Sequence, residues 1–300
     1  ISEFNNQIDI EIAEKAANMP LLSDAENGWG IDLYGEEVHM TRGSHYFRNQ
    51  PTPNPLYECS MIWQFDHKYS EPRIWIKKAD ISDDFLNKRV RRIQGLKKVP
   101  KDMLNDFEVH RLAIRKIASN TNERTLIVAL LPQGAIASNS LTVNFPLHHL
   151  PQKYNDLQLP YADILVLIAL LNSFVVDYIL RSRMTTNLNS FYLYQLPVPR
   201  LHAGDRFYAQ ILERSAKLIC TTSEFDNIAK EVGIGSHKSS STSEIQRAKL
   251  RAELDGIIAH LYGLDEDEFA YILSNFPIVT EPTKVATQNA YRDVERELVK

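Results

Sequence analysis

Residues 110–132, HRLAIRKIASNTNERTLIVALLP, limit the possible fold more than any other part of the chain. In the first half, Leu112 and Ile114 alternate with small or polar residues, which is the two-residue period of a strand with one buried face. The run TLIVALL at 125–131 is continuously apolar, as expected of a strand that is covered on both faces. The stretch between them, 119–124, is rich in turn-forming residues. These patterns predict a β-hairpin.

Basic and amide side chains surround this predicted turn. An arginine fork matches guanine edges and phosphates, and an asparagine amide pairs with adenine, so the hairpin has the side chains of a nucleic-acid contact. A hairpin whose polar residues simply face water has the same pattern, and the pattern alone leaves both interpretations open. The residues predicted to contact DNA here are Arg111, Arg115, Lys116, Asn120, Asn122 and Arg124.

The surrounding segment, 87–124, is strongly basic in an otherwise acidic chain. It holds eleven Lys or Arg and four Asp or Glu, a local excess of +7, whereas the whole chain carries a formal charge of −4. Clustered cations favour a polyanion, because each phosphate that they neutralise releases condensed counterions. A solvated basic loop is the alternative. The residues predicted to contact phosphate are Lys88, Arg89, Arg91, Arg92, Lys97 and Lys98.

The composition is that of an ordinary globular protein, with 44% hydrophobic and 24% charged residues over 300 positions. The two cysteines, Cys59 and Cys220, form no zinc or redox motif, which fits a reducing cytoplasm. The longest apolar run, 164–171, is shorter than the ~20 residues that span a bilayer, and it predicts a buried helix. We therefore expect a cytoplasmic protein without a membrane partner, and Ile1 in place of Met suggests a piece of a longer polypeptide.

The order of the predicted elements indicates an α+β fold, in which a mixed-sheet domain is followed by a helical C-terminal region. Helices are expected at 9–17 and, as one long buried element, at 161–182, with an extended aromatic-rich segment at 28–47. Strands are expected near 57–65, 73–78, 110–118, 124–131 and 141–145. The predicted domains are a connecting segment at 1–50, a mixed domain at 51–200 and a helical region at 201–300.

Helical signals dominate the last hundred residues. A helix is expected at 205–230, followed by the Gly/Ser-rich stretch GIGSHKSSSTS. Ser241 precedes Glu244 by three residues, and Asp265 precedes Glu268 by three, which is the capping-box spacing at the start of two further helices. Their apolar faces, which we interpret as packing surfaces, comprise Leu250, Leu254, Ile257, Ile258 and Leu261 in the first helix and Phe269, Ile272 and Phe276 in the second.

Motifs that would carry catalysis are incomplete. Residues 54–57, Asn-Pro-Leu-Tyr, resemble the Asn-Pro-Pro-Tyr motif of amino-methylating enzymes, but Leu56 replaces the second proline and no glycine-rich loop precedes the segment. The adjacent His148 and His149 lack the i, i+4 spacing that chelates a metal from one helix face. The aspartates at 80–84 lack the further acid and lysine of a nuclease centre. We expect no catalytic, metal or cofactor site in this chain.

Five blocks in the same order resemble the C-terminal half of large restriction-modification methylases, the Eco57I-like or type IIG group and its relatives in phage defence. The blocks are HMTRGSHYF at 39–47, PLYECSMIWQFDHKY at 55–69, HRLAIRKIASNTNERTLIVALLP at 110–132, LLNSFVVDYILRSRMTTNLNSFYLYQLPVP at 170–199 and RAELDGIIAHLYGLDEDEFAYILSNFPIV at 251–279. In that family an adenine-N6 methyltransferase domain, which binds S-adenosylmethionine, lies upstream. The resemblance implies that this chain is a target recognition domain with a helical tail.

Some positions match the family's pattern and others depart from it. The family has Tyr-Glu-Gly-Lys-Met where this chain has Tyr-Glu-Cys-Ser-Met at 57–61, so a glycine turn and a lysine of the family are absent. The resemblance carries matching positions over as candidates for a DNA face, and these are Gln64, Asp66, His67, Arg111, Arg115, Asn122 and Arg124.

Two more segments are expected on that face. The polar loop after the predicted buried helix contributes Arg181, Arg183, Thr185, Thr186, Asn187 and Asn189, although Asn and Thr side chains also terminate helices. His67 and Lys68 are the other candidates, with a buried structural histidine as the alternative for His67.

The resemblance and the basic tract together imply a non-catalytic module that recognises a specific sequence in double-stranded DNA. It would act for the upstream methyltransferase domain, which must extrude an adenine from the duplex. The alternative is a protein-interaction module, in which the Leu and Phe faces of the tail and the acidic run at 265–268 dock on a methyltransferase or defence-complex partner. The sequence leaves open the recognised bases, cleavage by the parent protein and the oligomeric state.

Overall fold

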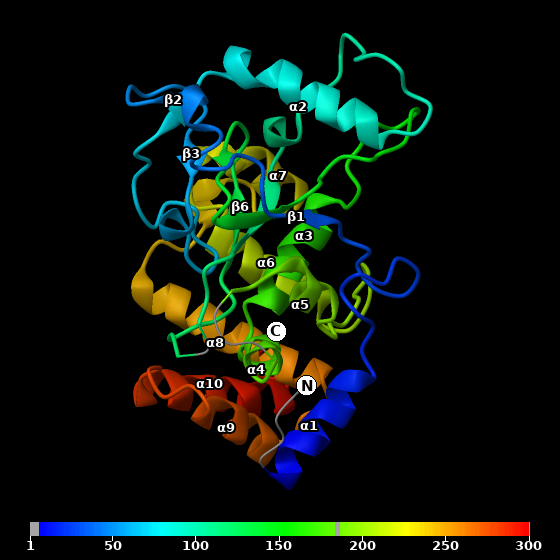
Figure 1. The fold of residues 1–300 in the computed structure, drawn as a ribbon. Coiled ribbons are helices and arrows are strands. Elements are labelled where there is room, and N and C mark those ends of the chain that lie inside the picture. Colours follow the sequence, from blue (N-terminus) through cyan, green and yellow to red (C-terminus); the bar gives the residue numbers. More distant parts are fainter. Residues whose placement is uncertain (1–5, 120, 184–186, 300) are drawn as a thin grey trace.

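The computed structural model describes residues 6–119, 121–183 and 187–299, and it shows an α+β fold (Figure 1). The helices are α1 (Gln7–Ala17), α2 (Lys78–Arg92), α3 (Tyr161–Leu171), α4 (Phe174–Arg181), α5 (Ser190–Tyr194), α6 (Tyr208–Ile219), α7 (Asp226–Glu231), α8 (Glu244–Leu261), α9 (Glu266–Ser274) and α10 (Glu281–Glu295). The strands are β1 (Leu33–Tyr34), β2 (Phe47–Arg48), β3 (Leu56–Tyr57), β4 (Trp75–Ile76), β5 (Arg111–Arg115), β6 (Val128–Leu131), β7 (Ile136–Ala137) and β8 (Leu141–Asn144). The predicted fold class is confirmed.

The central sheet has four strands in the order β1-β8-β5-β6, and every neighbouring pair is antiparallel. In its middle, Ala113 of β5 lies opposite Ala129 of β6 and Val143 of β8. There are also two small sheets, antiparallel β2–β4 and parallel β3–β7. The hairpin predicted at 110–132 is therefore present, with β5 and β6 as its strands.

β5 is buried on both faces, although its sequence alternation predicted only one buried face. Leu112 and Ile114 point into the large core that α3 and α4 also enter. On the opposite face, Ala113 packs into a second apolar cluster, to which the segment 57–62 contributes. This segment covers the face on which arginines were expected to meet solvent. The long strand predicted near 57–65 is wrong, because the strand in this region, β3, ends at Tyr57.

The long apolar segment forms two helices, α3 and α4, where one helix was predicted at 161–182. At the junction, the side-chain amide of Asn172 pairs with both backbone groups of Val128 in β6, at 3.0 and 2.9 Å. Ser173 then begins α4 by accepting a hydrogen bond from a backbone N–H of the new helix. Among the described residues no single helix is long and apolar enough to cross a membrane, and only α3 and α4 together have that length and composition, as a pair bent by 59°.

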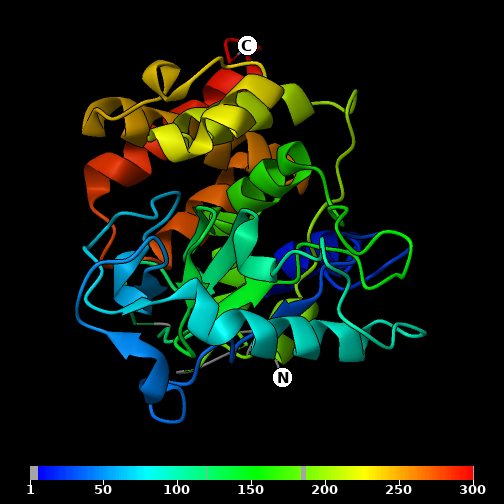
Figure 2. The same ribbon diagram turned by 90° about the horizontal axis from the view of Figure 1, so that it is seen from above.

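Helix α2 was not predicted, because its charged sequence has few apolar positions. Ile81 and Val90 form its buried side, and Phe107 packs in the same cluster as Ile81. The strand predicted at 73–78 is limited to β4. α2 and α10 lie on opposite sides of the molecule in both views (Figures 1 and 2).

The C-terminal helices bury the apolar faces that their periodicity predicted. Leu254 of α8 and Phe269 of α9 both lie in the large core. Asp265 caps α9 in a capping box with Glu268, as predicted. The helix start predicted at Ser241 is wrong, because α8 begins at Glu244 after Ser243. The helix predicted at 205–230 is divided into α6 and α7, and α10 was not predicted at all.

One apolar core connects the ends of the chain with its middle. The cluster includes Ile12 of α1, Leu130 of β6, Leu167 of α3 and Phe269 of α9. Helix α1 lies against α9, so the first and last parts of the chain are neighbours (Figure 1). The domain boundaries at 50 and 200 stay predictions, and this core crosses both of them.

Gly256 allows α8 and α10 to approach closely. A methyl group at this position would lie 2.8 Å from the backbone nitrogen of Tyr291 and 2.9 Å from the backbone carbonyl carbon of Ala290. These atoms belong to a packed helix and cannot rotate away. We expect Gly256→Ala to lower the free energy of unfolding by about 1–3 kcal/mol, despite the better helix propensity of alanine. Urea unfolding measures this change, and an unchanged midpoint with an unchanged slope would contradict the close helix contact.

Candidate nucleic-acid interface

The residues predicted to contact DNA fall into two groups in the structure. Arg89, Arg111, Arg124 and His67 are buried. The second group is exposed or half-buried, and it comprises Lys68, Lys88, Arg91, Arg92, Lys97, Lys98, Arg115, Lys116, Asn122, Arg181, Arg183, Asn187 and Asn189. Three further candidates, Asn120, Thr185 and Thr186, lie outside the described residues.

Arg111 forms a buried ion pair and is not available to DNA. Its guanidinium donates to both carboxylate oxygens of Glu37, at 2.6 and 2.9 Å, and to the carbonyl oxygen of Ala135 at 2.7 Å. The hydroxyl of Tyr34 donates to the same carboxylate at 2.7 Å. A buried charge requires such partners, because its hydration is lost. The prediction for Arg111 is wrong because Glu37, 74 residues upstream, lies against this face of β5.

Arg124 and Arg181 converge on one buried carboxylate, Asp177 of α4. The Nε atom of Arg124 lies 2.9 Å from Asp177 Oδ2, and the Nε atom of Arg181 lies 3.3 Å from Oδ1. Arg181 also donates to the backbone carbonyls of Asn122 and Glu123, at 2.5 and 2.8 Å. These bonds tie the β5–β6 loop to α4. Arg124 is buried in these contacts, so its prediction as a DNA contact is wrong. Arg181 is half-buried and has internal partners, and its DNA contact stays a prediction.

The buried side chain of Arg89 connects α2 to the rest of the protein. It donates to two backbone carbonyls, and its Nε atom lies 3.3 Å from Asp106 Oδ1. Burial lowers the pKa of Arg89 and raises the pKa of Asp106. The neighbouring Arg92 lies over the ring of Phe145, 4.1 Å from its centroid, and 3.6 Å from Asp106. The phosphate contact predicted for Arg89 is therefore wrong, and Arg92 also has an internal partner.

The C-terminal end of α2 and the loop that follows carry exposed cations, which we call the basic patch: Lys88, Arg91, Lys97, Lys98 and Lys101. In the part of the chain that the structure describes, no carboxylate lies within 4 Å of any of these five. Cations at the C-terminal end of a helix also stabilise the helix dipole. Without acidic partners, however, most of this positive charge stays available to an external anion.

Arg115 is half-buried beside two aromatic rings, and we call Trp63, Tyr69 and Arg115 the aromatic stack. The Nε atom of Arg115 donates to the carbonyl oxygen of Ile62 at 2.9 Å. The guanidinium of Arg115 lies 4.9 Å from the ring centroid of Trp63 and 5.8 Å from that of Tyr69. The two rings stack with centroids 5.4 Å apart. Tyr69 remains 57% exposed despite this stacking. An exposed ring such as that of Tyr69 can stack on a nucleobase.

Sequence reasoning missed Trp63 and Tyr69 as candidate contacts. The two rings meet because the chain turns sharply at 63–66, where Phe65 has a φ of 61°. A left-handed conformation is costly for a phenylalanine, and here the backbone N–H of Phe65 is held at 3.0 Å by Val128 in β6. The pair of aromatic residues was visible in the sequence, but no local signal indicated the turn.

His67 and Lys68 share one acidic partner, Glu224. The Nε2 atom of His67 lies 3.4 Å from Glu224 Oε2, and the ring packs edge-on against Phe225. The ammonium of Lys68 lies 3.0 Å from the same oxygen. The hydrogen bond with His67 lowers the pKa of Glu224. His67 is thus the buried structural histidine that was the alternative, and Lys68 is exposed but paired.

The remaining loop candidates have different roles. Asn189 caps α5 by accepting a backbone N–H at 3.3 Å, and Arg183 donates to a backbone carbonyl at 3.0 Å, so both have structural functions. Asn187 is exposed and pairs with the chain just after Lys116, which is half-buried. Asn122 is exposed on the β5–β6 loop. The structure therefore leaves Lys116, Asn122 and Asn187 as possible contacts near the end of the hairpin.

Two other residues that the motifs highlighted have internal partners. The amide of Gln64 donates to the carbonyl oxygens of Leu126 and Asn172, at 3.3 and 3.0 Å. The amide of Asn54 donates to the carbonyl oxygen of Gly134 at 3.0 Å. Both side chains therefore link loop segments that are distant in the sequence.

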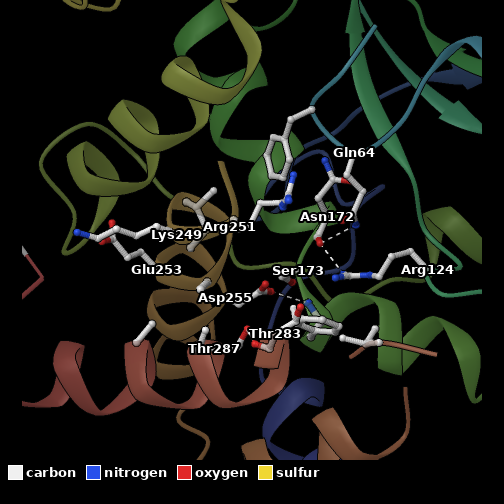
Figure 3. A pocket seen from close by; sticks show the side chains of 18 of the residues that line it. Gln64, Arg124, Asn172, Ser173, Lys249, Arg251, Glu253, Asp255, Thr283 and Thr287 are labelled. Carbon is white, nitrogen blue, oxygen red and sulfur yellow. Dashed lines mark hydrogen bonds and ion pairs between the residues drawn. The ribbon is translucent and has the colours of Figure 1, made fainter. Parts of the chain in front are cut away.

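A cavity of about 560 Å³ lies between the 63–65 turn, α8 and α10, and we call it the α8–α10 cavity (Figure 3). Arg251 and Asp255 project into it from α8, while Thr283 and Thr287 reach it from α10. Within the described residues there is no group of three or more His, Cys, Asp or Glu that could hold a metal ion.

Comparison with known proteins finds similarity among solved structures. No family model and no curated protein matches the chain. Among solved structures, the chain is similar to part of MmeI, a type IIL restriction-modification enzyme whose structure was determined in complex with DNA. The sequence identity is 12% and the TM-score is 0.34, and the match covers 78% of this chain and 31% of the MmeI chain. The chain thus spans about a third of the length of the enzyme that it matches.

Proposed function

We propose that this chain is the DNA-recognition module of a restriction-modification adenine-N6 methyltransferase and is itself non-catalytic. The five blocks that resemble type IIG methylases support this role. The proposal places the S-adenosylmethionine site and the chemistry in an upstream domain. It also places the protein in the cytoplasm and in phage defence.

The basic patch is the observation that carries the proposal. Its five cations are exposed and have no acidic partner among the described residues, while the whole chain has a net negative charge. Cations that are free of internal partners neutralise phosphates and release counterions. This selective clustering of free positive charge is typical of a surface that faces a polyanion.

The proposal divides the contacts by their physical role. The basic patch would hold the phosphates and set the orientation of the module on the duplex. Readout of bases would fall to the aromatic stack and to the exposed loop residues that remain, Lys116, Asn122 and Asn187. The buried arginines take no part, because their hydrogen-bonding groups are occupied inside the protein.

The double variant Lys97→Ala/Lys98→Ala tests the patch directly. We expect weaker binding to every duplex sequence and a salt dependence that is less steep, because two phosphate contacts are lost. With a slope of about 0.9 per neutralised phosphate, the plot of log K against log salt should flatten by roughly 2. Fluorescence anisotropy with a labelled duplex over a range of salt concentrations measures both effects.

The matched control is Lys249→Ala/Lys284→Ala, which makes the same change in net charge on α8 and α10. Lys249 lies 3.7 Å from Glu253, and Lys284 lies 3.0 Å from Glu281, so both are paired. DNA binding should be unchanged in this control. Equal losses in the two double variants would indicate a general charge effect, and no loss in the first would remove the patch from the DNA face.

The protein-interaction alternative was based on the apolar faces of the helical tail and on its acidic run, and both have partners within this chain. The Leu and Phe faces of the tail are buried in the chain's own core. In the acidic run, Glu266 lies 2.5 Å from Arg292, and Glu268 lies 2.5 Å from Lys15. These groups therefore stabilise the fold of this chain. If the protein shows no affinity for duplex DNA in a binding assay, the protein-interaction role becomes the better proposal.

A further inference from the structure

The α8–α10 cavity has a size and lining that suit a small planar ligand. Its volume is about 560 Å³, within the range of sites that enclose small molecules. Trp63 and Phe65 line it on the side of the sharp turn, while small apolar side chains of α8 and α10, such as Ala252 and Ala286, also line it. Aromatic and small apolar walls together accommodate a flat ring.

Asp255 places a buried carboxylate in this cavity. The residue is 5% exposed, and its Oδ1 atom accepts the backbone N–H of Phe174 at 2.8 Å (Figure 3). Its Oδ2 atom accepts no hydrogen bond from any described residue. The Oδ2 atom is not fully enclosed by the protein, so a ligand in the cavity that donates an N–H could reach it.

Arg251 lies one helical turn before Asp255 and projects to the same side of α8 (Figure 3). The two side chains form no ion pair with each other. The nearest carboxylate to Arg251 in the described chain is that of the exposed Glu244, at 4.0 Å. Most of the guanidinium donors are therefore free, and a strong donor and a strong acceptor line the same cavity.

We propose that the α8–α10 cavity binds a guanine base, with Arg251 donating to its O6 and N7 acceptors and Asp255 accepting its N1 and N2 protons. Guanine offers acceptors and donors side by side, which matches this donor and acceptor pair. The aromatic and apolar walls would enclose the ring. The base can come from a free guanine nucleotide or from DNA in which a guanine is unpaired.

The protonation state of Asp255 agrees with guanine. Burial raises the pKa of Asp255 to about 6, and Asp177 adds to this rise, while Arg124, the backbone N–H of Phe174 and Arg251 partly offset it. At neutral pH the group is mainly a carboxylate, which accepts hydrogen bonds and donates none. Guanine, with two neighbouring N–H donors, satisfies such a group better than adenine does. Binding should therefore weaken as the pH falls below about 6.

Calorimetric titration with guanosine tests the site. We expect saturable binding that is weakened about tenfold or more by Arg251→Ala and by Asp255→Asn, since each substitution removes a bidentate contact with the base. Asp255→Asn keeps an oxygen for the N–H of Phe174, and Arg251 is partly exposed, so thermal unfolding can verify that both variants are folded. Inosine, which lacks the N2 amine, should bind more weakly than guanosine. Lys284→Ala, which removes a paired cation of α10 that does not line the cavity, should have no effect.

A DNA-binding experiment distinguishes a free guanine nucleotide from an unpaired guanine in DNA. Two duplexes are compared, one with a guanine opposite cytosine and one with the same guanine opposite an abasic site. A preference for the abasic duplex that Arg251→Ala abolishes identifies an extruded DNA base, and equal binding to both identifies a free nucleotide. If guanosine does not bind at millimolar concentration, or binds equally to all variants, the inference is wrong. That failure leaves the basic patch untouched, because Lys97 and Lys98 do not line this cavity.

Discussion

Arg111→Ala should lower the free energy of unfolding by about 3–5 kcal/mol, because it leaves the carboxylate of Glu37 buried without its partner. The guanidinium donates to both oxygens of that carboxylate and to the carbonyl of Ala135, and the side chain is 1% exposed. Chemical denaturation followed by circular dichroism measures the loss. A change of this size is a large part of the total stability of an ordinary domain, so partial unfolding at 37 °C is expected.

Arg42→Ala is the matched control for this prediction. Arg42 is also paired with a glutamate, Glu36, at 3.1 Å, but both side chains are exposed, and such pairs contribute less than about 1 kcal/mol. A second test is the double variant Arg111→Leu/Glu37→Leu, which removes both charges and should recover part of the lost stability. If Arg111→Ala is as stable as the parent but binds DNA more weakly, the original DNA-contact hypothesis for Arg111 is restored.

Asp177→Ala, at the other end of the sheet, should also lower the free energy of unfolding by about 3–5 kcal/mol. Asp177 is fully buried and is the shared partner of Arg124 and Arg181. It also accepts the backbone N–H of Thr125 at 3.0 Å. The substitution therefore removes the carboxylate that two guanidinium groups share, and it leaves one buried N–H without its acceptor. Denaturant unfolding gives the free energy, and hydrogen exchange at 121–125 should become faster because the β5–β6 loop loses its anchor.

The control for Asp177 is Glu213→Ala, which removes the acid of a surface pair. Glu213 lies 2.6 Å from Lys217 one helical turn away, and pairs of this kind contribute about 0.3–0.5 kcal/mol. Asp177→Asn adds a further comparison, because it keeps acceptors for the N–H of Thr125 but loses the charge. We expect its stability to lie between those of the parent and Asp177→Ala. A loss of DNA affinity in Asp177→Ala without a loss of stability would contradict the structural role.

The elements predicted correctly are those whose local pattern agrees with their environment. The hairpin at 110–132 combines an alternating strand with a continuously apolar one, and both strands are in the structure. The start of α9 at Asp265 follows from a capping box that needs only three residues. Helix α2 was missed because its contacts with Phe107 and its neighbours involve few apolar positions, so the periodicity is weak.

The break between α3 and α4 had no local signal either. Asn172 and Ser173 interrupt a continuous apolar run, and an isolated helix could include both of them. They separate two helices because the amide of Asn172 bonds to the backbone of Val128 in β6, 44 residues away in the chain. A hydrogen bond between distant segments therefore decides the direction of α4 and with it the position of Asp177.

The charge excess of 87–124 and the strands of its hairpin are properties of the sequence alone, since composition and apolar periodicity are local. Which of those cations face solvent was decided by the tertiary structure. Arg111 and Arg124 are buried because Glu37 and Asp177, 74 and 53 residues away, come to lie beside them. Lys97 and Lys98 remain exposed because the fold brings no carboxylate of the described chain to them. A charge can be buried only where an opposite charge replaces its hydration, and that partner is supplied by the fold.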